Sequence, residues 1–428
     1  MSEKKSGFFP KLFITLGVLL LLTLAVWVFA RGRASGQLEN ADAKLDQAIG
    51  SFDDYLAALP NQDANESALR LETLAAELGL DIVPKSRPGE RPNANRHAVR
   101  KGLGDWLSAE LASGTRSVGE PPSEVTAFLT EHRPTIDAIV EHVATQPLPE
   151  WERQTDDYAA PIPNLLGHLN LTRVLLVAAL VDQRDGEVER AERELLTAWK
   201  LSLHLAETRP ALISHLIALA GIRLELATLN RLDVDPVAWR ERLNQVPYEA
   251  DPGRAFTGEA HHLRLLLREQ FNPFSPNADM PRWQLTLIQP VIQHGAAVAM
   301  DVHHHLIDEA RTADNCDVVF GRWSSEAMVP AETSWNPVVG MVVPNLENAV
   351  RRMHRIQLDL ALSRRVLDAR ERAASGSRPV VDLMPADCEE WSWREELHED
   401  GSFTLTWEGP EPWEPATSTV LPMSLSTR

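Results

Sequence analysis

The chain has little of what disulfide-rich or nucleic-acid-binding proteins need. Only two of its 428 residues are Cys, too few for the disulfide framework of a small stapled domain. Acidic side chains outnumber basic ones by 61 to 42, so the net charge is −19. A protein of this sign cannot bind nucleic acid through a general electrostatic footprint. We therefore expect no nucleic-acid partner.

The standard catalytic signatures are also missing. The sequence has no His-Glu-x-x-His, no Gly-x-Ser-x-Gly, no P-loop and no Gly-x-Gly-x-x-Gly motif. Carboxylate pairs are numerous, but without a fold-specific spacing they do not indicate general acid–base catalysis. The pattern therefore assigns no catalytic or cofactor-binding residue. It leaves the question of an enzyme open and favours a protein that is not one.

One long apolar run is the strongest signal in the sequence. Residues 12–30 (LFITLGVLLLLTLAVWVFA) carry no charge, and a helix of about 20 residues crosses a bilayer core of roughly 30 Å. Trp27 suits the membrane interface, and Arg31 and Arg33 follow the run. The run predicts a single-pass anchor in a bacterial inner membrane. Most of the chain should be extracytoplasmic, since long domains translocate largely regardless of charge.

Two other interpretations of this segment remain open. Residues 28–30 loosely resemble a signal-peptide cleavage site, but the run exceeds the usual apolar length of 7–15 residues. Arg31 would also be an unfavourable first residue of the mature protein. Gly7-Phe8 resembles a prepilin cleavage site, although Leu12 stands where most pilins carry Glu. A pilin-like secretion component is therefore a remote alternative.

The rest of the chain is patterned mainly as helices. Helical periodicity runs from residue 36 to about 375, with an amphipathic stripe over 36–59 that can continue the membrane helix. The most apolar block, 162–232, predicts the core, and 346–374 predicts a final long helix. We expect a mainly α fold with an N-terminal transmembrane helix and a multi-helix extracytoplasmic domain.

The last fifty residues change character. Residues 391–393 and 403–407 alternate in polarity and flank Asp400-Gly401, which predicts a small C-terminal β-hairpin. Tryptophans in this segment should fill a small core. The composition divides the chain into a cytoplasmic stub and anchor (1–34), a helical domain (35–378), and an aromatic hairpin with a Pro-rich tail (379–428).

A pair of helices inside the predicted core has a familiar spacing. Gly186, Ala191 and Ala198 resemble the turn and small positions of one tetratricopeptide-type pair. Only one copy is visible, and an array needs about three repeats. An ordinary helical hairpin is therefore the favoured interpretation.

Histidine is the one residue type that suggests metal chemistry. On a helix over 283–312, His294, Asp301 and His305 share a face, and Glu259-x-x-His262 has the i, i+3 spacing of di-iron bundles. Imidazole and carboxylate together could hold a transition metal. A di-iron site needs two more Glu from two other helices, which the pattern does not supply. A solvated helix face is the alternative, and the sequence favours it.

The two cysteines, Cys316 and Cys388, leave two alternatives. An even count in an oxidising compartment favours a disulfide. It would close a loop of about 70 residues and stabilise the fold by roughly 4 kcal/mol in the chain-entropy model. Two separate buried thiols are the other interpretation.

Four features together carry a resemblance. They are the anchor, the segment FLTEHRP at 128–134, the helical block 165–232 and the aromatic hairpin after Cys388. With them the chain resembles a family of uncharacterised, membrane-anchored, mostly helical envelope proteins of GC-rich bacteria. The resemblance implies architecture and no activity. We expect a helical scaffold or binding subunit of an envelope assembly, with protein partners. A periplasmic, metal-dependent enzyme that uses the His-rich helix is the alternative.

Overall fold

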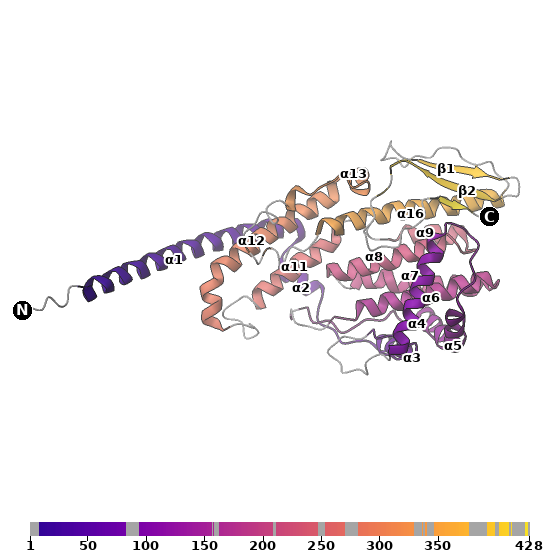
Figure 1. The fold of residues 1–428 in the computed structure, drawn as a ribbon, viewed down its shortest axis with the longest axis horizontal. Helices are drawn as coiled ribbons and strands as arrows, with labels where there is room; N and C mark the ends of the chain where they lie inside the picture. The colour runs from indigo at the N-terminus through magenta and orange to yellow at the C-terminus, as the bar shows by residue number, and fades with distance from the viewer. Residues whose placement is uncertain are drawn as a thin grey trace, which may run out of the picture. The chain divides into compact units, whose positions relative to one another are not determined.

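The protein is mainly helical, with a long apolar N-terminal helix and a small C-terminal antiparallel sheet (Figure 1). The computed structural model describes residues 8–82, 94–155, 157, 162–208, 211–246, 253–269, 281–328, 336, 339, 346–375, 392–398, 402–410, 412 and 424–426. The helices are α1 (Phe8–Ile49), α2 (Phe52–Ala58), α3 (Glu66–Glu77), α4 (Ala94–Ala112), α5 (Ser123–Thr145), α6 (Leu165–Arg184), α7 (Val188–Thr208), α8 (Leu212–Leu229), α9 (Pro236–Leu243), α11 (Arg254–Glu269), α12 (Arg282–Thr312), α13 (Asn315–Val319), the short 3-10 helix η1 (Glu326–Met328) and α16 (Leu346–Ala374).

The chain folds into two compact units, each made of segments that are distant in sequence. Unit 1 comprises Met1–Ala58, Ala260–Leu306 and Glu326–Pro344, and unit 2 comprises Leu59–Glu259, Ile307–Ser325 and Asn345–Arg428. The boundaries at 34 and 378 that the composition indicated are of a different kind and stay a prediction. Composition marks where the character of a chain changes, but it cannot detect a later segment that returns to pack on an earlier one.

Helix α1 combines an exposed apolar half with a half that packs inside unit 1. It has 42 residues, which corresponds to about 63 Å. In its first half Leu20 is 71% exposed and Phe29 is 72% exposed, whereas Ala34, Ala41 and Leu45 are buried. The amphipathic stripe thus continues the long apolar segment in one unbroken helix, as predicted.

Three described helices are long and apolar enough to cross a membrane. The apolar windows of α6 and α8 are 78% and 67% buried in the protein, whereas that of α1 is 0% buried. A helix whose apolar side chains are already covered by protein belongs to the interior. Helix α1 is therefore the candidate membrane span, and α6 and α8 form a core.

The core of unit 2 is the three-helix set α6, α7 and α8, which confirms the block predicted at 162–232. Gly186 has φ +85°, which allows the sharp turn between α6 and α7. Ala191 and Ala198 on α7 are fully buried. A Cβ on Gly221 of α8 would lie 2.6 Å from Ser202 Oγ, so any other residue here would displace that hydroxyl.

The C-terminal sheet packs on α16. Strands β1 (Ser392–Leu397) and β2 (Phe403–Glu408) are antiparallel, with Trp393 opposite Trp407, and the short β3 (Ser424–Ser426) pairs with β2. The predicted hairpin is confirmed, although its Asp400-Gly401 turn lies outside the described residues. The two tryptophan rings meet edge to face at 5.0 Å. Trp393 belongs to a buried apolar cluster, and Trp407 packs against it. The members of this cluster are Cys316, Val319, Leu358, Leu362, Val366, Ala369, Trp393, Phe403 and Leu405.

Cys316 lies at the edge of this cluster and is buried. The described part of the chain contains no free thiol. The proposed partner, Cys388, is outside the described residues. The Cys316–Cys388 disulfide therefore stays a prediction.

Candidate functional site

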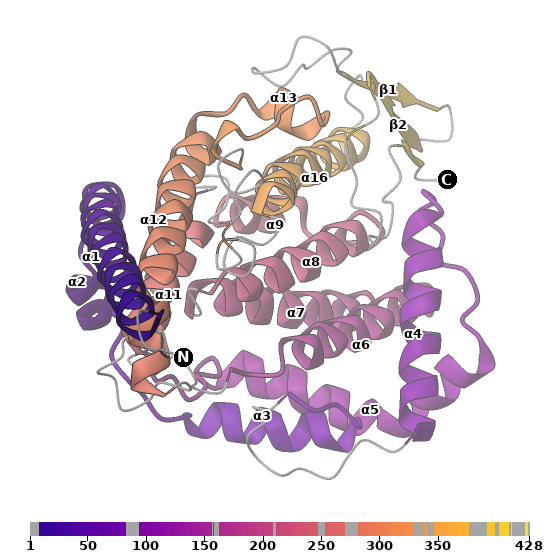
Figure 2. The same ribbon diagram turned by 60° about the vertical axis from the view of Figure 1, so that its left-hand side comes forward.

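In unit 1, α12 runs beside the second half of α1 and in the same direction (Figures 1 and 2). Two side-chain pairs join the helices: His294 Nδ1 lies 3.2 Å from Gln37 Oε1, and Lys44 Nζ lies 3.0 Å from Asp301 Oδ1. Both pairs are separated by 257 positions in the sequence. The two helices thus keep a constant parallel register over about two turns.

Helix α11 is fastened to the end of α1 by a single arginine. Arg264 Nε donates to Asp42 Oδ1 and Nη2 donates to Asp46 Oδ1, both at 2.7 Å. The arginine also donates to the backbone carbonyls of Asp42 and Gly50 at 3.0 and 3.4 Å. Its side chain is only 5% exposed. Asp42 and Asp46 lie one turn apart on one face, so one planar guanidinium can reach both.

His261 completes this junction as a neutral ring. It is 1% exposed and stacks on Tyr55 of α2 with ring centres 4.0 Å apart. Burial, and then the neighbouring Arg264 charge, lower the pKa of His261 to about 4. Arg264 Nη1 lies 3.3 Å from His261 Nδ1. Because arginine can only donate, Nδ1 accepts and the ring proton is on Nε2.

A groove opens beside this junction. Its volume is about 310 Å³, at the lower end of the range for small-molecule sites. Four apolar side chains and two carboxylates line it together with the paired arginine. The lining residues are Leu38, Glu39, Asp42, Phe52, Arg264, Leu267 and Met300.

The predicted metal ligands are spread over both units. Glu259 belongs to unit 2, where its carboxylate accepts from the backbone N–H of Leu212 at 3.2 Å. The other four candidates belong to unit 1. They are His262, His294, Asp301 and His305.

Two of those four lie next to side chains of α1, and a third is exposed to solvent. His294 faces Gln37, Asp301 pairs with Lys44, and His305 is exposed. Within the ranges that the structure describes, no three His, Cys, Asp or Glu side chains are grouped so that they could hold one metal ion. The metal site thus stays a prediction without support from the geometry.

Two neighbouring histidines on α12 give a matched test of this region. His305 is exposed, so we expect His305→Ala to change the free energy of unfolding by less than about 0.5 kcal/mol. His303 is fully buried and its Nδ1 lies 2.8 Å from the Ala299 carbonyl oxygen. His303→Ala should cost roughly 1–3 kcal/mol. Urea unfolding of both variants checks this, and equal costs would contradict the assignment of the exposed face.

Unit 2 contains a buried carboxyl that the sequence analysis missed. Glu225 on α8 is fully buried, and Ser202 Oγ on α7 donates to its Oε1 at 2.6 Å. Among the residues that the structure describes, Oε2 has no hydrogen-bond partner. Burial raises the pKa of Glu225 to about 8, against which the Ser202 hydrogen bond acts weakly. At neutral pH this side chain therefore carries a proton.

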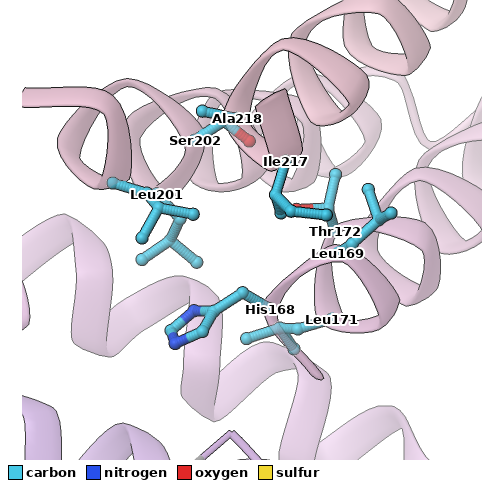
Figure 3. A pocket seen from close by; sticks show the side chains of 9 residues that line it. His168, Leu169, Leu171, Thr172, Leu201, Ser202, Ile217 and Ala218 are labelled. Carbon is cyan, nitrogen blue, oxygen red and sulfur yellow. The ribbon is translucent and has the colours of Figure 1, made fainter. Parts of the chain in front are cut away.

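The cavity next to Ser202 is too small for a substrate. Its volume is about 10 Å³, roughly the room that one water molecule needs. Figure 3 shows His168 and Thr172 of α6 approaching it from one side and Ser202 from another. His168 and Ser202 both line this cavity, and Ser202 also donates to Glu225, but the space admits no acyl group. This cluster is best explained as interior packing.

A buried ionic group joins three helices of unit 2. Arg133 on α5 donates to both Asp182 oxygens at 3.0 and 2.8 Å and to Glu194 Oε1 at 2.5 Å. Burial raises the pKa of Asp182, and it raises that of Glu194 well above its usual range with help from the Asp182 charge. One guanidinium therefore compensates two buried carboxyls, and α5, α6 and α7 are locked together.

Sequence signals for these groups exist but are weak. Asp42 and Asp46 at four-residue spacing indicate one shared cationic partner, although not which one. Glu225 is the one acidic residue of the mostly apolar helix α8, which indicates a buried acid. Arg133 lies inside the segment 128–134, where nothing local points to its partners.

The comparisons with known proteins add no relative. No protein-family model, no curated protein and no solved structure matches this chain. The family resemblance drawn from the sequence therefore remains an expectation, and function must be argued from the geometry.

Proposed function

We propose that the protein is a membrane-anchored helical binding subunit of a bacterial envelope assembly, with most of its chain on the extracytoplasmic side. The observation that carries the proposal is the continuity of α1. Its exposed apolar half suits a bilayer, and from Ala34 onward the same helix is part of the packing of unit 1. Such a helix holds unit 1 at a fixed distance from the membrane.

The groove of unit 1 is the surface where a partner would bind. Its lining combines Leu38, Phe52, Leu267 and Met300 with the carboxylate of Glu39. Apolar walls beside acidic groups suit an apolar side chain next to a lysine or arginine. Methionine adapts its shape to different partners. Arg264 is already paired with Asp42 and Asp46, so it does not favour an acidic ligand.

The enzyme alternative has less support from the described residues. The predicted metal ligands are not grouped, and the cavity beside Ser202 holds no more than one water molecule. A scaffold or binding role requires neither feature. Both observations concern the arrangement of side chains, and they favour binding over catalysis.

Site-specific photocrosslinking tests the proposed binding role. A photoreactive phenylalanine at Leu267, which lines the groove, should give a discrete crosslinked band in intact cells. The same residue at His305, exposed in unit 1 and outside the groove lining, is the control. The band should weaken several-fold when Glu39 is changed to Lys. Equal patterns at both positions, or no band at either, would contradict the proposal.

A further inference from the structure

The start of α12 carries two exposed apolar side chains that no part of the described chain covers. Trp283 is 67% exposed and Leu287 is 61% exposed. They are four residues apart and so lie on one face of the helix. Leu285, between them, is fully buried and holds this turn against the protein. A large exposed apolar pair on an ordered helix end indicates an interaction surface.

A hydrogen bond fixes the level of this turn along α1. Trp27 Nε1 donates to the backbone carbonyl of Leu287 at 2.9 Å. Trp27 lies three residues before the end of the apolar run, and the guanidinium of Arg31 covers its ring at 5.4 Å. Tryptophan followed by arginine is typical of the membrane–water interface. The exposed pair of α12 is thus placed at the level where α1 leaves the bilayer.

Pro290 explains why α12 turns at this level. Proline inside a helix removes one hydrogen bond and kinks the helix, and Pro290 lies inside α12. After it, α12 follows α1 through the Gln37–His294 and Lys44–Asp301 pairs. In Figure 1 the first turns of α12 bend away from the axis of α1. They therefore do not continue alongside the apolar half of α1 into the bilayer core.

We infer that the first turns of α12 are a second membrane contact, in which Trp283 and Leu287 insert into the outer lipid interface beside α1. The occupant of this surface is the lipid bilayer, because the surface is continuous with the membrane span through the Trp27 hydrogen bond. An apolar helix face at the headgroup level binds by burying its side chains a few ångströms into the acyl boundary. Two contacts, one spanning and one interfacial, fix the tilt of unit 1 relative to the membrane. The inference rests on the proposed anchoring by α1.

Spin-label accessibility in the full-length protein tests this inference. Single cysteines replace Trp283, Leu287, Leu24 or His305, and each variant is labelled and reconstituted in vesicles of phosphatidylethanolamine and phosphatidylglycerol. Wild-type protein treated in the same way gives the background from the native cysteines. The labels at 283, 287 and 24 should collide several-fold more often with oxygen than with a water-soluble nickel chelate. The label at 305 should not. Because the four side chains are exposed, the substitutions should not disturb folding.

The outcomes separate this inference from the anchor itself. Labels at 283 and 287 that behave like the label at 305, while the label at 24 is in lipid, would overturn the second contact and leave the anchor. A label at 24 exposed to the chelate would overturn both. Lipid-like accessibility at 24, 283 and 287 supports both.

Discussion

Replacing Glu225 with Gln is expected to stabilise the protein at alkaline pH and to leave it almost unchanged at pH 4. Burial raises the pKa of Glu225 from 4.5 to about 8. Between these values the folded state holds a proton that the unfolded state has released, so stability falls as the pH rises. A rise of that size corresponds to about 5 kcal/mol. Gln keeps the acceptor for Ser202 Oγ and has no proton to lose.

The measurement is the free energy of unfolding as a function of pH for three proteins. Between pH 5 and 8 the free energy of unfolding should fall more steeply for wild type than for Glu225→Gln. Above the folded-state pKa of Glu225 the difference between the two free energies should stay constant. Glu189→Gln is the control, since Glu189 is an exposed residue on α7 and its substitution should matter by less than about 0.5 kcal/mol. Parallel curves for wild type and Glu225→Gln would mean that Glu225 is not buried.

Replacing Arg133 with Met should be among the most destabilising single substitutions in unit 2. The change leaves Asp182 and Glu194, which are 3% and 0% exposed, without their shared cation. Removing one partner of a buried ion pair typically costs 3–5 kcal/mol. The deficit should shrink as the pH falls, because both carboxyls have raised pKa values and bind protons when the arginine is gone.

Arg190 offers a matched control for this prediction. Its Nε lies 4.0 Å from the same Asp182, but its side chain is 38% exposed. Arg190→Met should therefore cost no more than about 1 kcal/mol. Urea unfolding near neutral pH compares the two variants. Similar costs for Arg133→Met and Arg190→Met would contradict the central role of Arg133.

The local fold could be predicted because it depends on spacing along the chain. The uncharged run 12–30 predicted the exposed half of α1, and the stripe after residue 36 predicted that the helix continues. The predicted final helix at 346–374 coincides with α16 (Leu346–Ala374). Alternation around Trp393 and Trp407 predicted the hairpin. In each case the pattern lies within one element, so neighbours in sequence suffice to read it.

The candidate site could not be predicted in the same way. A buried stripe shows which face of α1 is covered, but not that α11 and α12 cover it. Arg264 meets Asp42 from 222 positions away, and nothing local links them. The histidines attracted attention because of their chemistry, yet His305 is exposed and the buried His261 and His303 were not among the predicted metal ligands. Which polar side chains contact one another depends on how helices that are distant in sequence pack, and local sequence patterns do not contain that information.

Membrane extraction of the full-length chain tests the central claim most directly. After cell lysis, the full-length protein should remain in the membrane pellet through an alkaline carbonate wash, which strips proteins held only at the surface. A variant without residues 1–33 should appear in the carbonate supernatant, since it keeps Ala34, Ala41 and Leu45 for packing but has lost the exposed apolar half of α1. Recovery of the full-length protein in the supernatant, or a mature N-terminus at Arg31, would contradict the anchor.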